Sequence, residues 1–308
     1  MSMSPDKDLL LRASEELNIL PAMIEKDWYV TQVITTLSQI QHHDFEIIFS
    51  GGTALSKAHR LIQRFSEDMD FRIIAPESTL NRKSLSKFKH AVVEALRASG
   101  LQIHNHQVKA RDENRFFAID IDYESHFSRS TALRPHIQIE VIVRPTYLSP
   151  AYLPVTSFIN ELTKQPPEVP RIGCLDPVEN AADKMSAIAW RIPDRIRGDS
   201  NDDPSIVRHI HDLAMLKDIA LAAPDFIRLV VAAMQQDDDR AKNNPSFEGL
   251  SMQEKFAQAI SILSTDAEYP REYDLFVRGT SYSQDDSTPA FKTAMEAVKQ
   301  LIQKVSGN

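Results

Sequence analysis

The sequence predicts an α+β protein in which a mixed domain is followed by a helical domain. Three observations support this prediction. Short apolar strands alternate with helical patterns up to about residue 145, prolines cluster between residues 150 and 170, and helical periodicity dominates the remainder. The chain has 308 residues, 42% of them hydrophobic, which suffices for one large or two medium-sized cores. The predicted domains are residues 1–170 and 171–308.

The elements of the first domain follow from apolar spacing and from the positions of Gly and Pro. Pro21 separates two helical patterns, and Gly51-Gly52 ends an apolar strand with a turn that has no Cβ to block a ligand. Gly100 ends a later helix. The predicted elements are helices within 5–40, a strand over 45–49, a helix over 53–63, a strand over 68–74, a helix over 84–99, and strands over 101–109, 116–123 and 135–144.

The second domain is predicted to be helical. The proline-rich stretch before it is the best boundary, because each proline removes a backbone donor and restricts the preceding residue. Residues 178–192 and 206–216 then show the 3.6-residue apolar period of amphipathic helices, and the charged stretch 193–204 between them is an exposed loop. Helical patterns alternate with turns to the end of the chain.

Composition restricts the function classes. Lys and Arg total 35 against 43 Asp and Glu, a formal charge of -8, so any nucleic-acid contact requires a local basic patch. A single cysteine, Cys174, excludes an intramolecular disulfide and a Cys-based zinc cluster, which fits a reducing compartment. The first ten residues lack the pattern of a signal peptide, and no apolar run approaches the ~18 residues of a membrane helix. We expect a cytoplasmic protein with no membrane partner.

Asp68 and Asp70 are the strongest candidates for chemistry. On a strand, both carboxylates project from one face, and Met69 and Phe71 enter the core. Mg²⁺ prefers such oxygen ligands and usually combines one or two carboxylates with substrate phosphates. Glu140, on the polar face of a later strand, is suited to be a third carboxylate that holds or deprotonates the attacking hydroxyl. These acids alone could equally form a solvated sheet face, but the Gly-Gly turn upstream favours nucleotidyl transfer.

Residues around the Gly-Gly turn are candidate phosphate contacts. The backbone N–H groups of Gly51 and Gly52 can approach a phosphate, and Thr53 could cap the following helix or donate to the phosphate. Ser66 could contact the triphosphate or stabilise the turn before the acids. Lys57 and Arg64 are phosphate contacts or surface charges.

A second Asp-x-Asp pair provides an internal comparison. Asp120 and Asp122 also lie on a predicted strand, but no Gly-Gly turn precedes them. They are predicted to be a solvated or pairing face, with the alternative that one of them replaces or assists Glu140.

Charged residues also occur on the helical patterns of the second domain. Lys184 shares a helical stripe with Asn180 and Arg191, and could neutralise a triphosphate. Arg208 and Asp212 are four residues apart, so they could pair with each other or reach the cleft. An exposed Lys or an intrahelical ion pair is the commoner outcome for such residues.

The order of these motifs resembles the AbiEii/AbiGii nucleotidyltransferase toxin family, which includes the MenT toxins. The resemblance extends from about Glu25 to the region of Phe291. The motifs that carry it are Gly51-Gly52-Thr53-Ala54-Leu55 with Lys57, Arg64-x-Ser66-Glu67-Asp68-x-Asp70-Phe71, Ile139-Glu140-Val141 with Arg144, Ala182-Asp183-Lys184, and Arg208-His209 with Asp212-Leu213.

The resemblance implies a DNA-polymerase-β-like nucleotidyltransferase core followed by a helical domain, with the active site between them. Asp68 and Asp70 resemble the metal acids, Ser66 and Lys184 the triphosphate contacts, and Asp212 a further essential acid. The implied protein is a metal-dependent nucleotidyltransferase toxin with a cognate antitoxin, and some relatives modify the 3′ acceptor end of tRNA. His211 departs from the aromatic residue expected beside Asp212.

We therefore predict transfer of a nucleoside monophosphate from a nucleoside triphosphate to an RNA 3′ end, with tRNA as the expected acceptor and Mg²⁺ or Mn²⁺ as the cofactor. The side chains of Arg191, Arg195 and Arg197 are candidates for a local RNA contact, or are ordinary loop charges. A small-molecule hydroxyl is the alternative acceptor. The other alternative is a non-catalytic nucleotide-binding partner of an antitoxin.

Overall fold

The computed structural model describes residues 5–42, 44–66, 68–127, 134–200, 202–240, 249–283 and 288–307. The chain divides into two compact units, neither of which is continuous in sequence. Unit 1 comprises residues 1–60 and 65–175, and unit 2 comprises residues 61–64 and 176–308. The predicted domain boundary after residue 170 stays a prediction.

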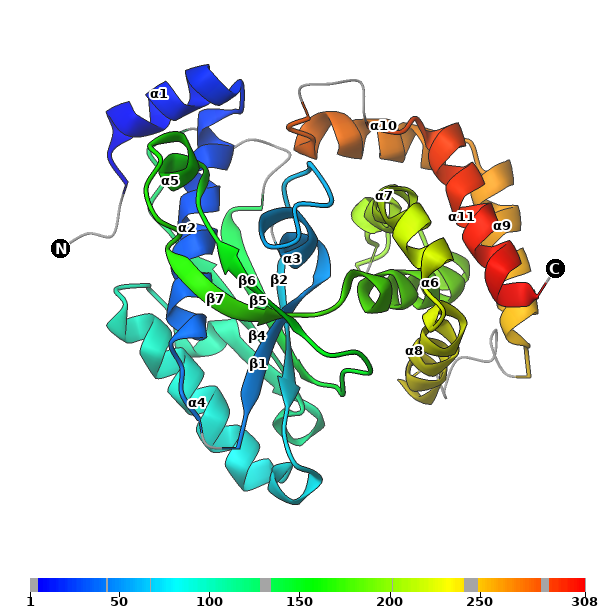
Figure 1. Cartoon of the computed structure of the whole chain (residues 1–308), viewed down its shortest axis with the longest axis horizontal. Coiled ribbons are helices and arrows are strands. Elements are labelled where there is room, and N and C mark those ends of the chain that lie inside the picture. Colours follow the sequence, from blue (N-terminus) through cyan, green and yellow to red (C-terminus); the bar gives the residue numbers. More distant parts are fainter. Residues whose placement is uncertain are drawn as a thin grey trace. The chain divides into compact units, whose positions relative to one another are not determined.

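The described part of unit 1 is built on a seven-stranded mixed sheet with the order β3-β4-β5-β2-β1-β7-β6. In its centre, β2 pairs antiparallel with β1 and parallel with β5. This arrangement, coloured blue to green in Figure 1, confirms a mixed α+β fold. The elements are α1 (Lys7–Leu17), α2 (Pro21–Ser38), β1 (Glu46–Ser50), α3 (Gly51–Lys57), β2 (Asp68–Ile74), η1 (Glu77–Thr79), α4 (Arg82–Ala98), η2 (Asn105–Gln107), β3 (Val108–Arg111), η3 (Asp112–Asn114), β4 (Phe116–Asp122), β5 (His136–Val143), β6 (Ala151–Val155), α5 (Phe158–Leu162) and β7 (Val169–Cys174).

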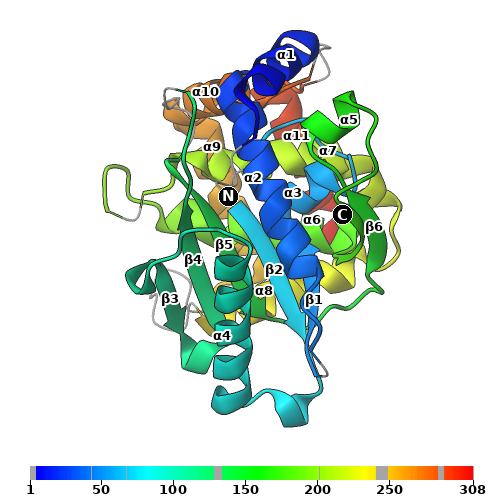
Figure 2. The same ribbon diagram turned by 90° about the vertical axis from the view of Figure 1, so that its left-hand side faces the viewer.

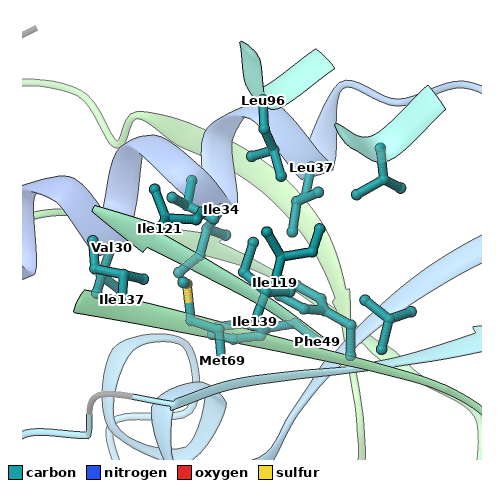
Figure 3. Close-up of a cluster of buried hydrophobic side chains, with 14 of the residues drawn as sticks. Val30, Ile34, Leu37, Phe49, Met69, Leu96, Ile119, Ile121, Ile137 and Ile139 are labelled. Carbon is teal, nitrogen blue, oxygen red and sulfur yellow. The ribbon is translucent and has the colours of Figure 1, made fainter. Parts of the chain in front are cut away.

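Helices α2 and α4 cover one face of this sheet (Figure 2). Pro21 is the first residue of α2, where its missing N–H costs no hydrogen bond, and the side chain of Asn81 caps α4 by accepting from the Ser84 N–H. The apolar residues of both helices pack against the alternate apolar residues of the central strands (Figure 3). Because this core takes the Met69 and Phe71 side chains of β2, the alternating Asp68 and Asp70 lie on the opposite face, which positions the candidate site.

Three consecutive charged residues of α2 are buried, and each has a partner. Glu25 accepts hydrogen bonds from the Ser125 hydroxyl and the His126 N–H, and Lys26 donates to the Arg134 carbonyl oxygen at 2.9 Å. Asp27 pairs with Lys57 of α3 and accepts from the Phe158 N–H at 2.9 Å. Helix α2 is therefore bonded to distant segments of unit 1 through groups that would be costly to bury alone.

Two elements differ from the predicted ones by more than a few residues. Helix α3 begins at Gly51, so the two glycines form its first turn, and it ends at Lys57 well before Gln63. Arg60 then adopts a positive φ of 56°, which a continuing helix does not allow. The strand predicted over 101–109 is mostly irregular, because η2 intervenes and pairing as β3 starts at Val108.

The proline-rich stretch contains two strands that were not predicted. Strand β7 pairs parallel with β1 through Phe49 and Cys174, and β6 pairs antiparallel with β7 at the edge of the sheet. Pro154 lies at the register shift between Leu153 and Val155 of β6. A proline is tolerated there because an edge strand with a bulge does not need every backbone donor. This stretch therefore completes the sheet of unit 1.

The described part of unit 2 is helical, apart from the segment 61–64. An isolated bridge joins Arg64 of this segment to Ser281. Within the described residues, no helix is both long enough and apolar enough to cross a membrane. The elements are α6 (Pro177–Asp194), η4 (Pro204–Val207), α7 (Arg208–Ala222), α8 (Phe226–Arg240), α9 (Met252–Thr265), α10 (Glu268–Thr280) and α11 (Phe291–Ser306).

Phe88 tests the packing of α4 on the sheet. Its side chain is fully buried and its ring centroid lies 5.0 Å from that of Phe45. We expect Phe88→Ala to lower the free energy of unfolding by about 3–5 kcal/mol, because it leaves a cavity in the core. Ser86→Ala, exposed on the same helix, should stay within about 0.5 kcal/mol of the wild type. Denaturant unfolding of both variants measures this, and equal midpoints would contradict the packing.

Candidate active site

Acidic side chains form a row on the sheet face opposite the core. Parallel pairing of β2 with β5 places Asp70 directly beside Glu140, and Asp68 beside Gln138. Met69 and Phe71, which alternate with the acids, are fully buried on the other face. The alternation predicted from the sequence is thus present, and Asp68, Asp70 and Glu140 share one half-exposed face.

The start of α3 lies against the Asp70 carboxylate. A Cβ added to Gly51 would lie 1.9 Å from Asp70 Oδ2, and Gly51 has a φ of +72°, which side chains rarely adopt. The hydroxyl of Ser50 donates to the Asp70 carbonyl oxygen at 3.1 Å, and that of Thr53 donates to the Asp68 carbonyl oxygen at 2.5 Å. Thr53 therefore joins α3 to β2, and only a glycine fits at position 51.

Asp68 already has a cationic partner. Arg134 donates to Asp68 Oδ1 at 2.7 Å and to Gln138 Oε1 at 2.7 Å. Neither Arg134 nor Gln138 was predicted to belong to the site, although Gln138 alternates with Glu140 on β5 and its place on this face follows from that spacing. The ion pair is partly exposed, with 40% of the Arg134 side chain accessible, so water screens it.

The carboxylates of this face fit a hard divalent cation by their chemistry. Carboxylate oxygens are the ligands that Mg²⁺ and Mn²⁺ prefer, and Asp70 and Glu140 are neighbours on adjacent strands. Among the described residues, however, no three His, Cys, Asp or Glu side chains form a ready group of metal ligands. A cation bound through Asp68 Oδ1 would compete with Arg134 for that oxygen.

The second Asp-x-Asp pair forms hydrogen bonds and an ion pair within the sheet. Asp120 accepts from Lys109 and from Gln138, each at 3.1 Å, and Asp122 accepts from the Gln107 amide at 2.8 Å. These contacts agree with the pairing face predicted for β4. Gly51 lies against Asp70, which distinguishes the β2 pair from the β4 pair.

Lys57 and Ser66 have different environments. The Lys57 ammonium pairs with Asp27, and the two side chains are only 10% and 2% exposed. Burial raises the pKa of Asp27, and Lys57 acts in the opposite direction. We interpret Lys57 as an anchor of α3 on α2. Ser66 is half-buried and precedes β2 by two residues.

Unit 2 contains a buried ion cluster around Asp212. Arg64 donates to both carboxylate oxygens, at 2.7 and 2.6 Å, and Lys184 Nζ lies 2.7 Å from Oδ2. His211 Nδ1 lies 3.2 Å from Oδ1. Burial alone would raise the pKa of Asp212, but Arg64, Lys184 and His211 outweigh it and hold this pKa well below its usual value. Asp212 is therefore a buried anion that fixes two cations, and Arg64 is not a surface charge.

The arginines considered for RNA contact are bonded to carboxylates. Arg191 pairs with Asp203 at 2.6 Å, Arg195 pairs with Glu272 at 2.6 Å, and Arg197 pairs with Asp266. The hydrogen bonds that the Arg195 guanidinium donates to Glu272 raise the pKa of Arg195 above its usual value. The loop that carries Arg195 and Arg197 is thus neutralised by acidic residues of the α9–α10 region, whose distance along the chain hid this pairing from the sequence.

Comparison with known proteins places this geometry in context. The sequence model of a family described as "Nucleotidyl transferase AbiEii toxin, Type IV TA system" matches residues 36–297. Among solved structures, MenT4, a nucleotidyltransferase toxin from Mycobacterium tuberculosis H37Rv, has 18% identity and a TM-score of 0.53, with 96% of this chain and 99% of that chain covered. This likeness concerns the fold.

A nucleotidyltransferase-like antigenic protein from Paracoccidioides brasiliensis has 12% identity and a TM-score of 0.36, with 74% of this chain and 91% of that chain covered. That likeness is too low to inform the fold. No curated protein matches the sequence.

Gly51 offers a test of the contact between α3 and Asp70. We expect Gly51→Ala to destabilise the protein and to disturb the carboxylate row, because the new methyl group meets Asp70 Oδ2. Gly198→Ala is the matched control, since Gly198 has a φ of +77° with nothing within 4 Å of an added Cβ. It should cost only the ~1–2 kcal/mol of the left-handed conformation. Unfolding free energies that are equal for the two variants would refute the close contact.

Asp212 offers a test of the buried cluster. Asp212→Asn should lower the free energy of unfolding by about 3–5 kcal/mol at neutral pH, because Arg64 and Lys184 stay buried without their anion. Asp218→Asn on the same helix, where the side chain is 90% exposed, is the control.

The pH dependence of this loss follows from the lowered pKa of Asp212. A depressed folded-state pKa stabilises the protein above the unfolded value of about 3.9, and this stabilisation disappears as the pH falls below it. The difference in unfolding free energy between wild type and Asp212→Asn should therefore be constant near neutral pH and narrow in acid. If the difference in unfolding free energy widened in acid, this result would contradict a lowered pKa of Asp212.

Proposed function

We propose that this chain, which belongs to the AbiEii family of nucleotidyltransferase toxins of type IV toxin–antitoxin systems, transfers a nucleoside monophosphate from a nucleoside triphosphate to the 3′-hydroxyl of an RNA. The acceptor we propose is tRNA, and the other product is pyrophosphate. A cognate antitoxin is the partner that the family implies. Unit 1 is proposed to have the DNA-polymerase-β-like architecture of nucleotidyltransferases, and residues 171–308 to supply Lys184 and Asp212 to the same reaction.

The observation that supports this proposal most is the acidic row bordered by a glycine. Asp70 and Glu140 are register partners on β2 and β5, Asp68 shares their face, and Gly51 has no Cβ that would collide with the Asp70 carboxylate. Carboxylates on rigid neighbouring strands keep their positions while charge moves in the reaction. The backbone at the start of α3, at Gly51, Gly52 and Thr53, is proposed to bind the triphosphate together with Ser66.

The proposed reaction is a displacement at phosphorus. The 3′-hydroxyl oxygen attacks the α-phosphorus, the bond from this phosphorus to the pyrophosphate oxygen breaks, and the hydroxyl proton passes to Glu140. Asp68, Asp70 and Glu140 are the residues proposed to hold Mg²⁺ or Mn²⁺. When bound, the cation supplies positive charge against the phosphate oxygens. Lys184 is proposed to neutralise the triphosphate, held in position by Asp212 at 2.7 Å.

Asp68 and Asp70 test the proposed chemistry. Asp68→Asn and Asp70→Asn should each lower nucleotide incorporation by roughly 100-fold or more, because each removes a charge from the proposed site without removing its volume. The measurement is incubation of the protein with each labelled triphosphate, a divalent cation and total tRNA, followed by mapping of the labelled end. Chelation of the cation should abolish incorporation, and Mg²⁺ or Mn²⁺ should restore it.

Asp122→Asn is the matched control, because Asp122 belongs to the other Asp-x-Asp pair and is exposed. This variant should retain incorporation. Wild-type activity of Asp68→Asn would disprove the mechanism. Labelling of a small-molecule hydroxyl in place of RNA would show that the acceptor is a small molecule. Binding of a nucleotide without release of pyrophosphate would indicate a non-catalytic protein.

A further inference from the structure

Basic residues are concentrated in one segment of this acidic chain. The 30 residues from 82 to 111 contain seven of the 35 Lys and Arg and one of the 43 Asp and Glu. His90, His104 and His106 lie in the same segment. The segment covers α4, η2 and β3, so its charge belongs to one helix and to the edge of the sheet beyond β4. Net charge alone hides this local excess.

The outer face of α4 presents several of these cations to solvent. Arg82, Lys83 and Lys87 are exposed, and within the described part of the chain none of the three forms an ion pair. The apolar side of the helix, including Phe88, packs on the sheet. Glu94, the acid of this helix, pairs with Arg97 at 2.9 Å. The charges are therefore held on a rigid surface and are not neutralised by it.

Strand β3 carries further cations at this edge, on the sheet face of the acidic row, which is opposite the face that α4 covers. Lys109 pairs with Ala118 of β4, Ala118 with Glu140 of β5, and Glu140 with Asp70 of β2. Side chains along such a register row share one face, so Lys109 lies on the face of Asp70 and Glu140. Three strand spacings of about 4.8 Å separate the two ends of the row, or ~14 Å. Arg111 follows on the same face of β3.

The α4 and β3 cations lie at the same edge of unit 1. Lys89 of α4 donates to Asn114 of η3 at 2.6 Å, and η3 directly follows β3. Figure 2 shows β3 beside α4. Asp112 and Glu113 of η3 are the neighbouring acids. We call Arg82, Lys83, Lys87, Lys109 and Arg111 the basic edge.

We infer that the basic edge binds the phosphate backbone of the RNA acceptor and guides it toward the acidic row; this inference rests on the proposed function. Lys109 is engaged by Asp120, but its side chain is 68% exposed, and such a surface pair contributes at most ~1 kcal/mol. Phosphates can therefore compete for it. An acidic enzyme that binds a polyanion needs such a local excess of charge, because its overall field is repulsive.

Surface chemistry favours RNA over other anionic partners. Protein interfaces are anchored by apolar and aromatic groups, and helices that lie on membranes insert an apolar face. Among the described residues, the large exposed hydrophobic side chains all lie outside α4 and β3. The apolar face of α4 is used by the core. A surface that has cations but no apolar anchor suits a phosphate backbone, whose binding is mainly electrostatic.

The test uses the full chain and three sets of substitutions. Arg82→Gln/Lys83→Gln/Lys87→Gln removes the α4 cations, and Lys109→Gln/Arg111→Gln removes those of β3. Arg12→Gln/Lys292→Gln/Lys304→Gln is the matched control, because these three cations are exposed on other helices. Binding of labelled total tRNA is measured across a salt series without nucleotide. The KM for tRNA and the KM for the triphosphate are then measured in the incorporation assay.

The α4 variant should weaken tRNA binding about tenfold and reduce the slope of log affinity against log salt by about 2, because each lost phosphate contact removes ~0.7–0.9 from the slope. The β3 variant, which removes two cations, should lower this slope by about 1.5. In the incorporation assay, both should raise the KM for tRNA and leave the KM for the triphosphate and kcat unchanged. The control variant should match the wild type in slope.

Equal slopes for all variants would overturn the inference. The inference would also be overturned if the basic edge were required for binding polyglutamate or phosphatidylserine vesicles but not for binding tRNA. Because tRNA binding is measured without nucleotide, a wild type that binds tRNA through this edge but incorporates nothing would refute the proposed chemistry alone.

Discussion

The alternation of side chains along β2 is the constraint on which the candidate site depends. One residue of each neighbouring pair must enter the core, and the next must face away from it. The buried residues Met69 and Phe71 of β2 and Ile139 of β5 take the core side, which places Asp68, Asp70 and Glu140 on the other side. A slip of one residue in β2 would bury both acids and expose Met69. The packing energy of the core therefore also holds the carboxylates in position.

Buried charges connect segments that lie far apart in the sequence. In unit 1, the Asp27 carboxylate of α2 forms an ion pair with Lys57 of α3. In unit 2, the Asp212 carboxylate forms ion pairs with both Arg64 and Lys184. Such pairs contribute little net stability compared with apolar residues of the same size, because both charges lose water. Removing one member is costly, so these pairs make wrong arrangements of the chain much less favourable than the native one. They explain why charged residues occur inside otherwise apolar helices.

Local sequence patterns predicted well the features that depend only on residues close together in the sequence. The faces of Asp70 and Glu140 followed from strand periodicity. Gly51 was expected to leave room for a ligand, and the structure places the Asp70 carboxylate against it. Partners from distant segments could not be predicted in this way: Lys57 and Asp27 are 30 residues apart, and Arg64 and Asp212 are 148 apart. Strand β6 was hidden because Pro154 at its bulge weakens the strand pattern, although an edge strand tolerates it. The roles of the site residues in catalysis are chemical, and geometry alone does not assign them.

The excursion of residues 61–64 into unit 2 has a consequence for how this protein can be divided. The chain enters unit 2 after Arg60, returns at Phe65, and enters it again after Leu175. A fragment that stopped at Leu175 would carry Arg64 without Asp212, and a fragment that started at Asp176 would carry Asp212 without Arg64. Neither fragment therefore contains both members of this ion pair. Recombination that exchanged one unit between relatives would thus separate a buried ion pair, which favours inheritance of the two units as a single gene segment.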